Sequence, residues 1–196
     1  MNFLAHAYLS ENDKKVMIGN FIADAVKGNS YERFPDGIRK GILLHRFIDE
    51  YTDNHEVFKA SKKRLQPTYD KFSGVIVDIY YDHFLAKNWS EYSDIPLKEF
   101  VSEAYSILID HFFILPARSK RILPFMVSQN WLVGYANFKD LDRVFHGMSN
   151  RTRRYNSGME NAVTDLQKNY QYYLDEFTKF FPQIIDAARI KKGSLI

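Results

Sequence analysis

The chain has 196 residues, of which 45% are hydrophobic and 16% aromatic, and this is enough to bury the core of one domain. Its 27 basic and 24 acidic residues leave a net charge of only +3, a balance that argues against a nucleic-acid-binding protein. No cysteine is present, so disulfides and thiolate zinc sites are excluded, and a metal ion would need histidine, carboxylate or carbonyl ligands. Such ligands suit magnesium, manganese, iron or zinc.

No linker rich in proline, glycine or serine divides the chain, so we predict a single domain over residues 1–196. The N-terminal sequence Met1–His6 lacks a basic stretch followed by a long apolar segment, and no run of 18 apolar residues occurs. Secretion signals and membrane spans need such segments. We therefore expect a soluble, cytoplasmic protein without a membrane partner.

Apolar residues recur at steps of three and four along most of the chain, and no stretch alternates with a period of two for long. This pattern predicts an all-α fold, a single-domain helical bundle. Gly28 and Pro182 are expected to end helices, and Gln66-Pro67 is expected to lie in a connection. The predicted helices span residues 2–10, 14–27, 38–55, 69–88, 96–113, 117–129, 139–148, 159–181 and 183–190.

The first two predicted helices each carry two polar residues one turn apart in apolar surroundings. Asn2 and His6 form the first pair, and Asn20 and Asp24 form the second. Residues four apart lie on the same face of a helix. A lone histidine in such a place fits a hydrogen-bonded core residue as well as a metal ligand, so both interpretations of His6 stay open.

The helix predicted at residues 38–55 has an imidazole and a carboxylate where leucines would be expected. Its inner stripe is formed by Ile38, Ile42, His45, Asp49 and Thr52. Burying a lone ionised carboxylate costs several kcal/mol or shifts its pKa. We therefore expect His45 and Asp49 to have a charged partner, either each other, a group on a neighbouring helix or a metal ion.

The helix predicted at residues 69–88 carries Asp78 and Asp82 one turn apart on an apolar stripe, with His83 beside them. Two carboxylates so placed repel each other. Something positive is therefore expected between them.

Four successive helices thus contribute inward polar side chains, and helices that place ligands one turn apart can build a cage for a divalent cation. The chain has no Glu-x-x-His of the di-iron bundles, no His-Glu-x-x-His zinc motif, no P-loop, no GxGxxG and no GxSxG. These motifs mark the common alternative chemistries. Water activation by one or two metal ions is therefore the leading hypothesis.

Five motifs follow one another along the chain: Asn2-Phe3-Leu4-Ala5-His6, Gly19–Asp24 with Lys27-Gly28, the run from His45 to His55, Asp78–Ala86 with Trp89, and Trp131-Leu132 with Tyr135. From residue 2 to about residue 155 their order and spacing resemble the acyl carrier protein phosphodiesterases. That family is distantly related to the HD-domain metal-dependent phosphohydrolases, so the resemblance implies an HD-domain-like helical bundle. The adjacent pair here is Asp82-His83, the reverse of the His-Asp dipeptide.

The resemblance also implies an activity. The reaction is hydrolysis of the phosphodiester that joins 4'-phosphopantetheine to a serine of acyl carrier protein, with Mn²⁺ as the ion, or Mg²⁺, Fe²⁺ or another divalent ion in its place. From the stripe positions, the expected metal ligands are Asp24, His45, Asp49, Asp82 and His83. Asp78 is expected to orient a ligand histidine or to accept a proton from water, and His6 is a candidate ligand or a general acid for the leaving serine oxygen.

Acyl carrier proteins are small and acidic, as the resemblance implies, so clustered basic residues become candidates for a docking surface. These are Arg118, Lys120, Arg121, Arg151, Arg153 and Arg154. An ordinary solvated surface is the alternative interpretation. Two other functions stay open: a phosphohydrolase acting on a nucleotide or another small phosphoester, and a non-enzymatic helical interaction module.

Overall fold

A computed structural model describes residues 1–195. These residues form α- and 3₁₀-helices and no strand, so the all-α prediction is confirmed. The α-helices are α1 (Phe3–Tyr8), α2 (Lys14–Ile22), α3 (Asp36–Asn54), α4 (Glu56–Tyr69), α5 (Ser73–Lys87), α6 (Leu97–Asp110), α7 (Ala117–Ser128), α8 (Trp131–Gly134), α9 (Phe138–Arg151), α10 (Ala162–Lys168) and α11 (Tyr170–Ser194). Within this part of the chain, no helix is long and apolar enough to cross a membrane.

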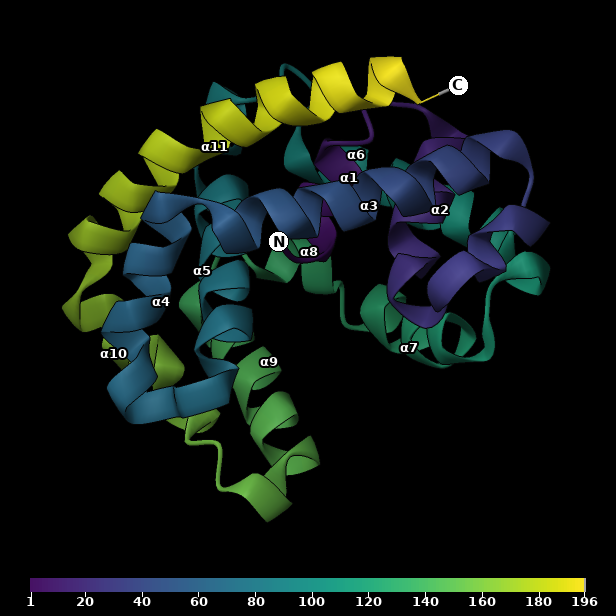
Figure 1. Cartoon of the computed structure of the whole chain (residues 1–196). Coiled ribbons are helices and arrows are strands. Elements are labelled where there is room, and N and C mark those ends of the chain that lie inside the picture. Colours follow the sequence, from purple (N-terminus) through teal and green to yellow (C-terminus); the bar gives the residue numbers. More distant parts are fainter. Residues whose placement is uncertain (196) are drawn as a thin grey trace.

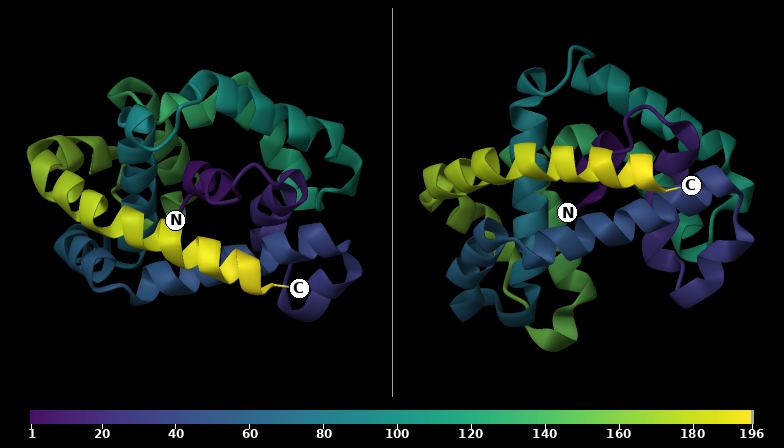
Figure 2. Two further views of the ribbon diagram at one scale, coloured as in Figure 1. Left: turned by 90° about the horizontal axis from the view of Figure 1, so that it is seen from above. Right: turned by 45° about the horizontal axis from the view of Figure 1, so that its top comes forward.

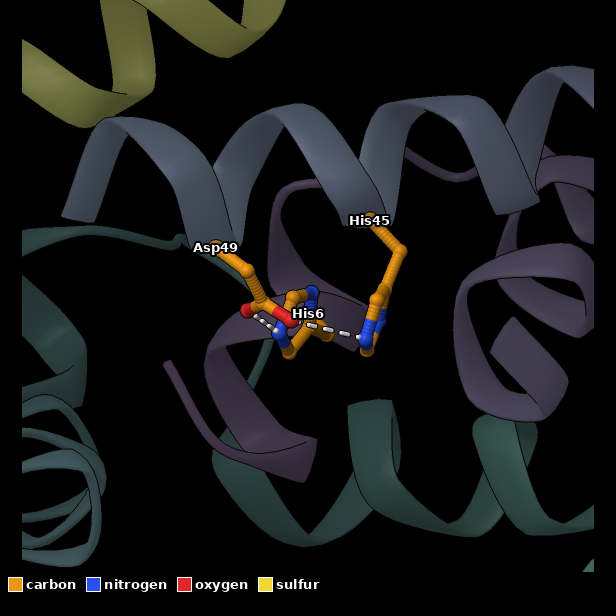
Figure 3. Close-up of side chains that lie close together, drawn as sticks. All are labelled: His6, His45 and Asp49. Carbon is orange, nitrogen blue, oxygen red and sulfur yellow. Dashed lines mark hydrogen bonds and ion pairs between the residues drawn. The ribbon is translucent and has the colours of Figure 1, made fainter. Parts of the chain in front are cut away.

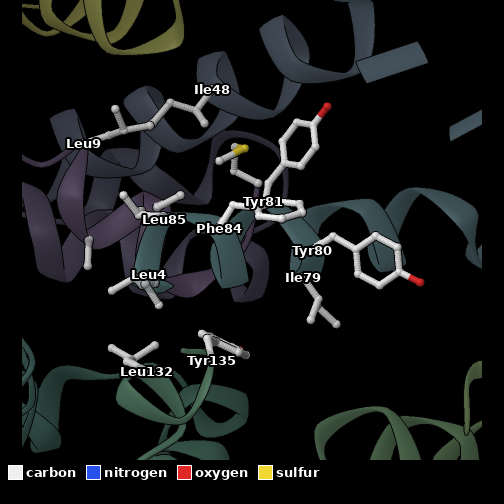
Figure 4. Packing of buried hydrophobic residues seen from close by; sticks show 14 of the residues in the cluster. Leu4, Leu9, Ile48, Ile79, Tyr80, Tyr81, Phe84, Leu85, Leu132 and Tyr135 are labelled. Atoms are coloured by element: carbon white, nitrogen blue, oxygen red, sulfur yellow. The ribbon is translucent and has the colours of Figure 1, made fainter. Parts of the chain in front are cut away.

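Helix α5 forms the centre of the core. Its residues from Ile79 to Ala86 are all buried, and a helix that is apolar around most of its circumference must be covered on every side. Helices α1, α4 and α11 contact it. Figure 4 shows Leu4, Leu132 and Tyr135 among the side chains that pack around it.

The longest helix, α11, lies along α3 and also contacts α4 and α5 (Figures 1 and 2). The shorter helices α7, α8 and α9 lie on the other side of α3, in the lower part of Figure 1. The N-terminal helix α1 lies in the interior between these two groups. This arrangement places the polar residues of α1 next to those of α3.

Helices α2 and α3 cross at very short distance because a glycine stands on each of them. A Cβ atom added at Gly19 would overlap the carbonyl oxygen of Ile38, and one added at Gly41 would overlap that of Val16. Only glycine permits this approach. Asn20 on α2 and His45 on α3 then line one small pocket together with His6.

Several of the expected helix boundaries are wrong. The helix expected to end at Gly28 ends at Ile22 as α2, and Gly28 instead begins the 3₁₀-helix Gly28–Arg33. Residues 56–69 form α4, which includes Pro67, so Gln66-Pro67 is not a connection. The helix begins after His55, whose Nδ1 accepts a hydrogen bond from the backbone N–H of Val57 at 3.3 Å. An imidazole in this place satisfies one of the free N–H groups of the first turn, which the sequence pattern does not indicate.

Pro182 does not end a helix either. Helix α11 continues through it to Ser194, and the break occurs earlier, at Asn169 between α10 and α11. A proline inside a helix costs about 3 kcal/mol. Buried Phe177 and Phe181 before it and Ile184 and Ala188 after it offset this cost, since each large apolar side chain contributes about 1.5 to 3 kcal/mol on burial.

Candidate active site

Three side chains from two helices converge below α3: His6 of α1, and His45 and Asp49 of α3 (Figure 3). His6 Nε2 lies 3.1 Å from Asp49 Oδ1, and His45 Nε2 lies 3.0 Å from Asp49 Oδ2. The two imidazole rings stack with their centroids 4.0 Å apart. One ligand atom from each residue lies within 4.8 Å of the other two, so the three atoms can share one cation.

Asn20 of α2 determines which nitrogen of His6 carries the proton. Its Nδ2 donates to the carbonyl oxygen of His6 at 2.9 Å and to Ser10 Oγ at 3.1 Å. Its Oδ1 is therefore the acceptor that faces His6 Nδ1 at 2.9 Å, and Nδ1 donates. Burial, together with the neighbouring charge of His45, lowers the pKa of His6 to about 4, so the ring is neutral at pH 7.

The lone pair of His6 Nε2 therefore points at a carboxylate oxygen of Asp49. Two electron-rich atoms at 3.1 Å repel each other unless a positive charge lies between them or beside them. A histidine whose other nitrogen is fixed by a hydrogen bond is the usual form of a metal ligand. His6 therefore fits the ligand interpretation better than that of a satisfied core histidine.

His45 has no hydrogen-bond partner of good geometry at either ring nitrogen, although both nitrogens are buried. Its Nε2 approaches Asp49 Oδ2 at 3.0 Å and Asp24 Oδ1 at 3.5 Å without the angle of a hydrogen bond. Burial lowers the pKa of His45, but the two carboxylates outweigh it and raise the pKa to about 9. The surroundings of the His45 ring therefore favour a positive charge, either on the ring itself or on a cation bound beside it.

The two carboxylates stay ionised for the same reason. Partial burial raises the pKa of Asp49, but His45 and the charge of the Met1 amino group outweigh this and hold the pKa well below its usual range. The neighbouring His45 likewise lowers the pKa of Asp24. The side chains of Asp49 and Asp24 are 41% and 60% exposed, so the buried histidines sit behind carboxylates that face solvent.

A cavity of about 230 Å³ adjoins the cluster, and its wall is strongly acidic. It is lined by Met1, Asn2, Asp24, His45, Asp49, Asp53, Val75 and Asp78. The amino group of Met1 lies 3.0 Å from Asp78 Oδ1 and 3.6 Å from Asp49 Oδ1. Burial nevertheless raises the pKa of Asp78 above its ordinary value.

The structure places Asp82 and His83 of α5 outside this cavity lining. Asp82 Oδ2 accepts from the backbone N–H of Leu4 at 2.8 Å, and Oδ1 accepts from that of Ala5 at 3.1 Å. His83 Nδ1 lies 2.7 Å from the carbonyl oxygen of Tyr135, and its Nε2 lies 3.3 Å from the hydroxyl of Tyr170. Both side chains therefore hold α1 and the Tyr135 segment to the core, and their ligand role stays a prediction.

The two carboxylates of α5, Asp78 and Asp82, each have a positive partner from the N-terminal segment. The positive end of α1, with its free N–H groups, faces Asp82, and the Met1 amino group faces Asp78. Burial still dominates for Asp82 and raises its pKa to about 7. The two positive partners lie outside α5, and its own sequence gives no sign of them.

The basic residues fall into different surroundings. Arg118, Arg121 and Arg151 line a common groove between α7 and α9. Lys120 instead donates to the carbonyl oxygen of Phe113 at 2.8 Å. Arg153 and Arg154 are exposed on the 3₁₀-helix Arg153–Tyr155 and are not in the groove lining.

Comparisons with known proteins identify the family of the chain. A family model described as "Acyl carrier protein phosphodiesterase" matches residues 1–184. The chain belongs to this family. Proteins named acyl carrier protein phosphodiesterase from Enterobacter sp. (strain 638) and Yersinia pestis are 32% and 31% identical over 193 residues, which cover 98% of this chain and 100% of each relative. The protein of that name from Escherichia coli O139:H28 is 32% identical over 192 residues, 97% of this chain and 99% of its own length.

The family match contains every residue of the His6, His45 and Asp49 cluster. The family is one of hydrolases, as its name states. No solved structure matches the chain. The HD-domain-like character of the bundle therefore stays a prediction, while its helical class is confirmed.

Proposed function

We propose that this chain removes the prosthetic group from holo acyl carrier protein. Water adds to the phosphorus of the diester, the bond from phosphorus to the serine oxygen breaks, and that oxygen takes up a proton. The products are apo carrier protein and 4'-phosphopantetheine. The proposal is supported by the family match along residues 1–184 and by relatives of equal length that carry the activity in their name.

The observation that carries the chemistry is the convergence of His6 Nε2, His45 Nε2 and the Asp49 carboxylate. We propose that these groups, with Asp24, hold a divalent cation, in the first place Mn²⁺. The donor set fits, because His6 offers a lone pair to a carboxylate and His45 has two buried nitrogens without a hydrogen-bond partner. A cation held there would lower the pKa of water and neutralise charge on the phosphoryl oxygens.

The acidic wall of the cavity also argues for a cation. Asp24, Asp49, Asp53 and Asp78 line the same 230 Å³. A phosphodiester is an anion, and four carboxylates would repel it at this distance. A cation beside Asp49 would offset part of this negative charge and would attract the phosphate directly.

Asp78 is proposed to accept the proton that the attacking water loses. Its carboxyl group lies in the cavity lining, and burial raises its pKa above its ordinary value, which makes the carboxylate a stronger base. Asn20 has a separate role, because it holds His6 in the tautomer that leaves Nε2 free.

Mass spectrometry of holo acyl carrier protein tests the proposal. The purified chain is stripped of metal with EDTA, supplied with Mn²⁺ and incubated with the carrier. We expect the carrier to lose the mass of 4'-phosphopantetheine with Mn²⁺ and to keep it with EDTA. Loss of the group in EDTA would reject the metal, because then the side chains alone would suffice.

The same metal-loaded chain, assayed also with nucleotides and for Mn²⁺ binding, separates the alternatives. Phosphate release from nucleotides with an unchanged carrier would point to a phosphohydrolase of small substrates. Silence toward both, together with no bound Mn²⁺ by calorimetry, would point to a non-enzymatic helical module whose polar groups only satisfy one another.

A further inference from the structure

A wide cavity that shares no lining residue with the acidic one lies between α7 and α9. It encloses about 1060 Å³. Two turns of an α-helix with side chains, about 11 Å long and 10 to 12 Å wide, occupy about this space. In Figure 1 the two helices lie below α3 and the N-terminus.

The rim of this groove is basic. Arg118 and Arg121 on α7 face Arg143 and Arg151 on α9, and Asp140 is the one acid of the lining. Asp140 is already paired with Arg143 at 2.7 Å. Within residues 1–195, Arg118 and Arg121 form no ion pair, although both are exposed.

The floor of the groove is apolar. Phe125, Ile122, Trp131 and Val144 belong to its lining, and the Phe125 side chain is 56% exposed. The indole N–H of Trp131 donates to Gln129 at 2.9 Å, so the one polar atom of this ring already has a partner. Exposed aromatic surface enclosed by charges is typical of protein interfaces.

We infer that the groove between α7 and α9 binds an amphipathic helix that presents carboxylates to its arginines and apolar side chains to its floor. A hydrocarbon chain would leave the arginines without partners, and a purely polar partner would leave the aromatic floor in water. For the identity of the partner the inference rests on the proposed function, in which this helix belongs to the carrier protein. Arginine is well suited to such a contact, because its planar group binds a carboxylate through two hydrogen bonds.

The groove also adjoins the acidic cavity. The 3₁₀-helix Ala23–Ala25, which carries Asp24, contacts α7, and α8 contacts both α7 and α9. A partner seated in the groove thus lies beside the wall of the cavity that would receive its phosphodiester. The basic groove orients the protein substrate, while the acidic cavity acts on its phosphate.

Binding of apo acyl carrier protein by surface plasmon resonance tests the groove without relying on catalysis. We expect Arg118→Glu/Arg121→Glu to weaken binding at least about thirtyfold, since two charge-assisted contacts become repulsive. Phe125→Ser should weaken it about fivefold through the floor. The matched control Lys62→Glu/Lys63→Glu reverses the same number of charges on exposed positions of α4 and should change the dissociation constant less than threefold.

The result can overturn the inference in three ways. Equal weakening by Arg153→Glu/Arg154→Glu would mean a diffuse basic surface rather than this groove. Tighter binding of single-stranded RNA, competing with the carrier, would assign the groove to nucleic acid. Unchanged carrier binding by Arg118→Glu/Arg121→Glu, in a protein that still releases 4'-phosphopantetheine, would reject the groove and leave the proposed function intact.

Carrier binding that depends on the groove, in a chain that releases no 4'-phosphopantetheine, would have the opposite meaning. The groove would be supported and the proposed activity would fail. Raising the salt from about 50 to about 300 mM should weaken carrier binding to the original chain several-fold more than binding to the Arg118→Glu/Arg121→Glu variant, because salt screens exposed charges.

Discussion

The His45 and Asp49 pair on α3 and the Asp82 and His83 pair on α5 contain the same two residue types, yet their surroundings differ. Both oxygens of Asp82 accept backbone hydrogen bonds, and both nitrogens of His83 have a neighbour. Neither nitrogen of His45 has a hydrogen-bond partner of good geometry. The α5 pair, whose polar atoms all have hydrogen-bond partners, holds helices together. The α3 pair converges with buried nitrogens that lack such partners, which marks a site that favours a positive charge.

The largest expected effect comes from Asp49. Replacing Asp49 by Asn keeps the shape of the side chain but removes the charge that faces both histidines. We expect turnover of holo carrier protein to fall at least about a thousandfold, worth about 4 kcal/mol in the barrier, and Mn²⁺ affinity to fall at least about a hundredfold. Mass spectrometry and calorimetry measure the two. Turnover above a tenth of the original value would place the reaction elsewhere.

The α5 pair should behave in the opposite way. Replacing Asp82 by Ala removes two buried acceptors from the first turn of α1, so we expect a loss of about 2 to 3 kcal/mol in the free energy of unfolding. Mn²⁺ affinity should change less than about threefold in the folded protein. Urea unfolding in EDTA gives the first quantity. If Asp82→Asn abolished Mn²⁺ binding with its fold intact, the two pairs would share one metal site after all.

Asn20 offers a subtler test of the metal site of His6, His45 and Asp49, because it contacts this cluster only through His6. Without Asn20 Oδ1 the ring can turn or change its tautomer, so Asn20→Ala is expected to reduce Mn²⁺ affinity about 10- to 100-fold. Ser10→Ala is the matched control, since it removes a hydrogen bond to Asn20 Nδ2 and leaves Oδ1 on His6. Its effect should stay below about threefold. Equal effects of the two variants would mean that Asn20 acts through packing alone.

The smallest expected effect concerns pH. In EDTA the pKa of folded His45 is raised to about 9 from 6.5, so its charge stabilises the protein fully below pH 6.5, and this contribution is lost as the pH rises through 9. We expect the original chain to lose about 1 to 2 kcal/mol more than His45→Gln between those values, allowing for the exposed carboxylates. Urea unfolding at both pH values gives the difference. Parallel curves would show that His45 carries no such charge.

Much of the fold follows from periodicity. Steps of three and four predict helices, and the stripe predicted for α3 is confirmed at Ile38, Ile42, His45 and Thr52, which are all buried. The prediction for Pro182 is wrong because the apolar stripe of α11 continues on both sides of it. Local rules for proline fail where packing on a core offsets a missing hydrogen bond.

For the candidate site, the sequence indicates which side of a helix is inward but not what lies opposite. His45 and Asp49 face the side chain of His6 on α1, whereas Asp82 faces the backbone of α1. Backbone N–H groups leave no trace in a sequence pattern, so the positions on α3 and α5 look equivalent in the sequence. The lining of the groove could not be predicted from the sequence for the same reason. Arg143 lies near Arg118 and Arg121 only because α9 lies opposite α7 in the fold.

The hydrogen bonds from the first turn of α1 to Asp82 also affect the order in which the chain folds during translation. A nascent chain that ends within α4 already contains His6, Asp24, His45 and Asp49, yet α1 still lacks the carboxylate that anchors its first turn. Six residues are too short to stay helical unaided. We therefore expect His6 to settle stably opposite Asp49 only after α5 has emerged from the ribosome, and the proposed cation to bind after that step.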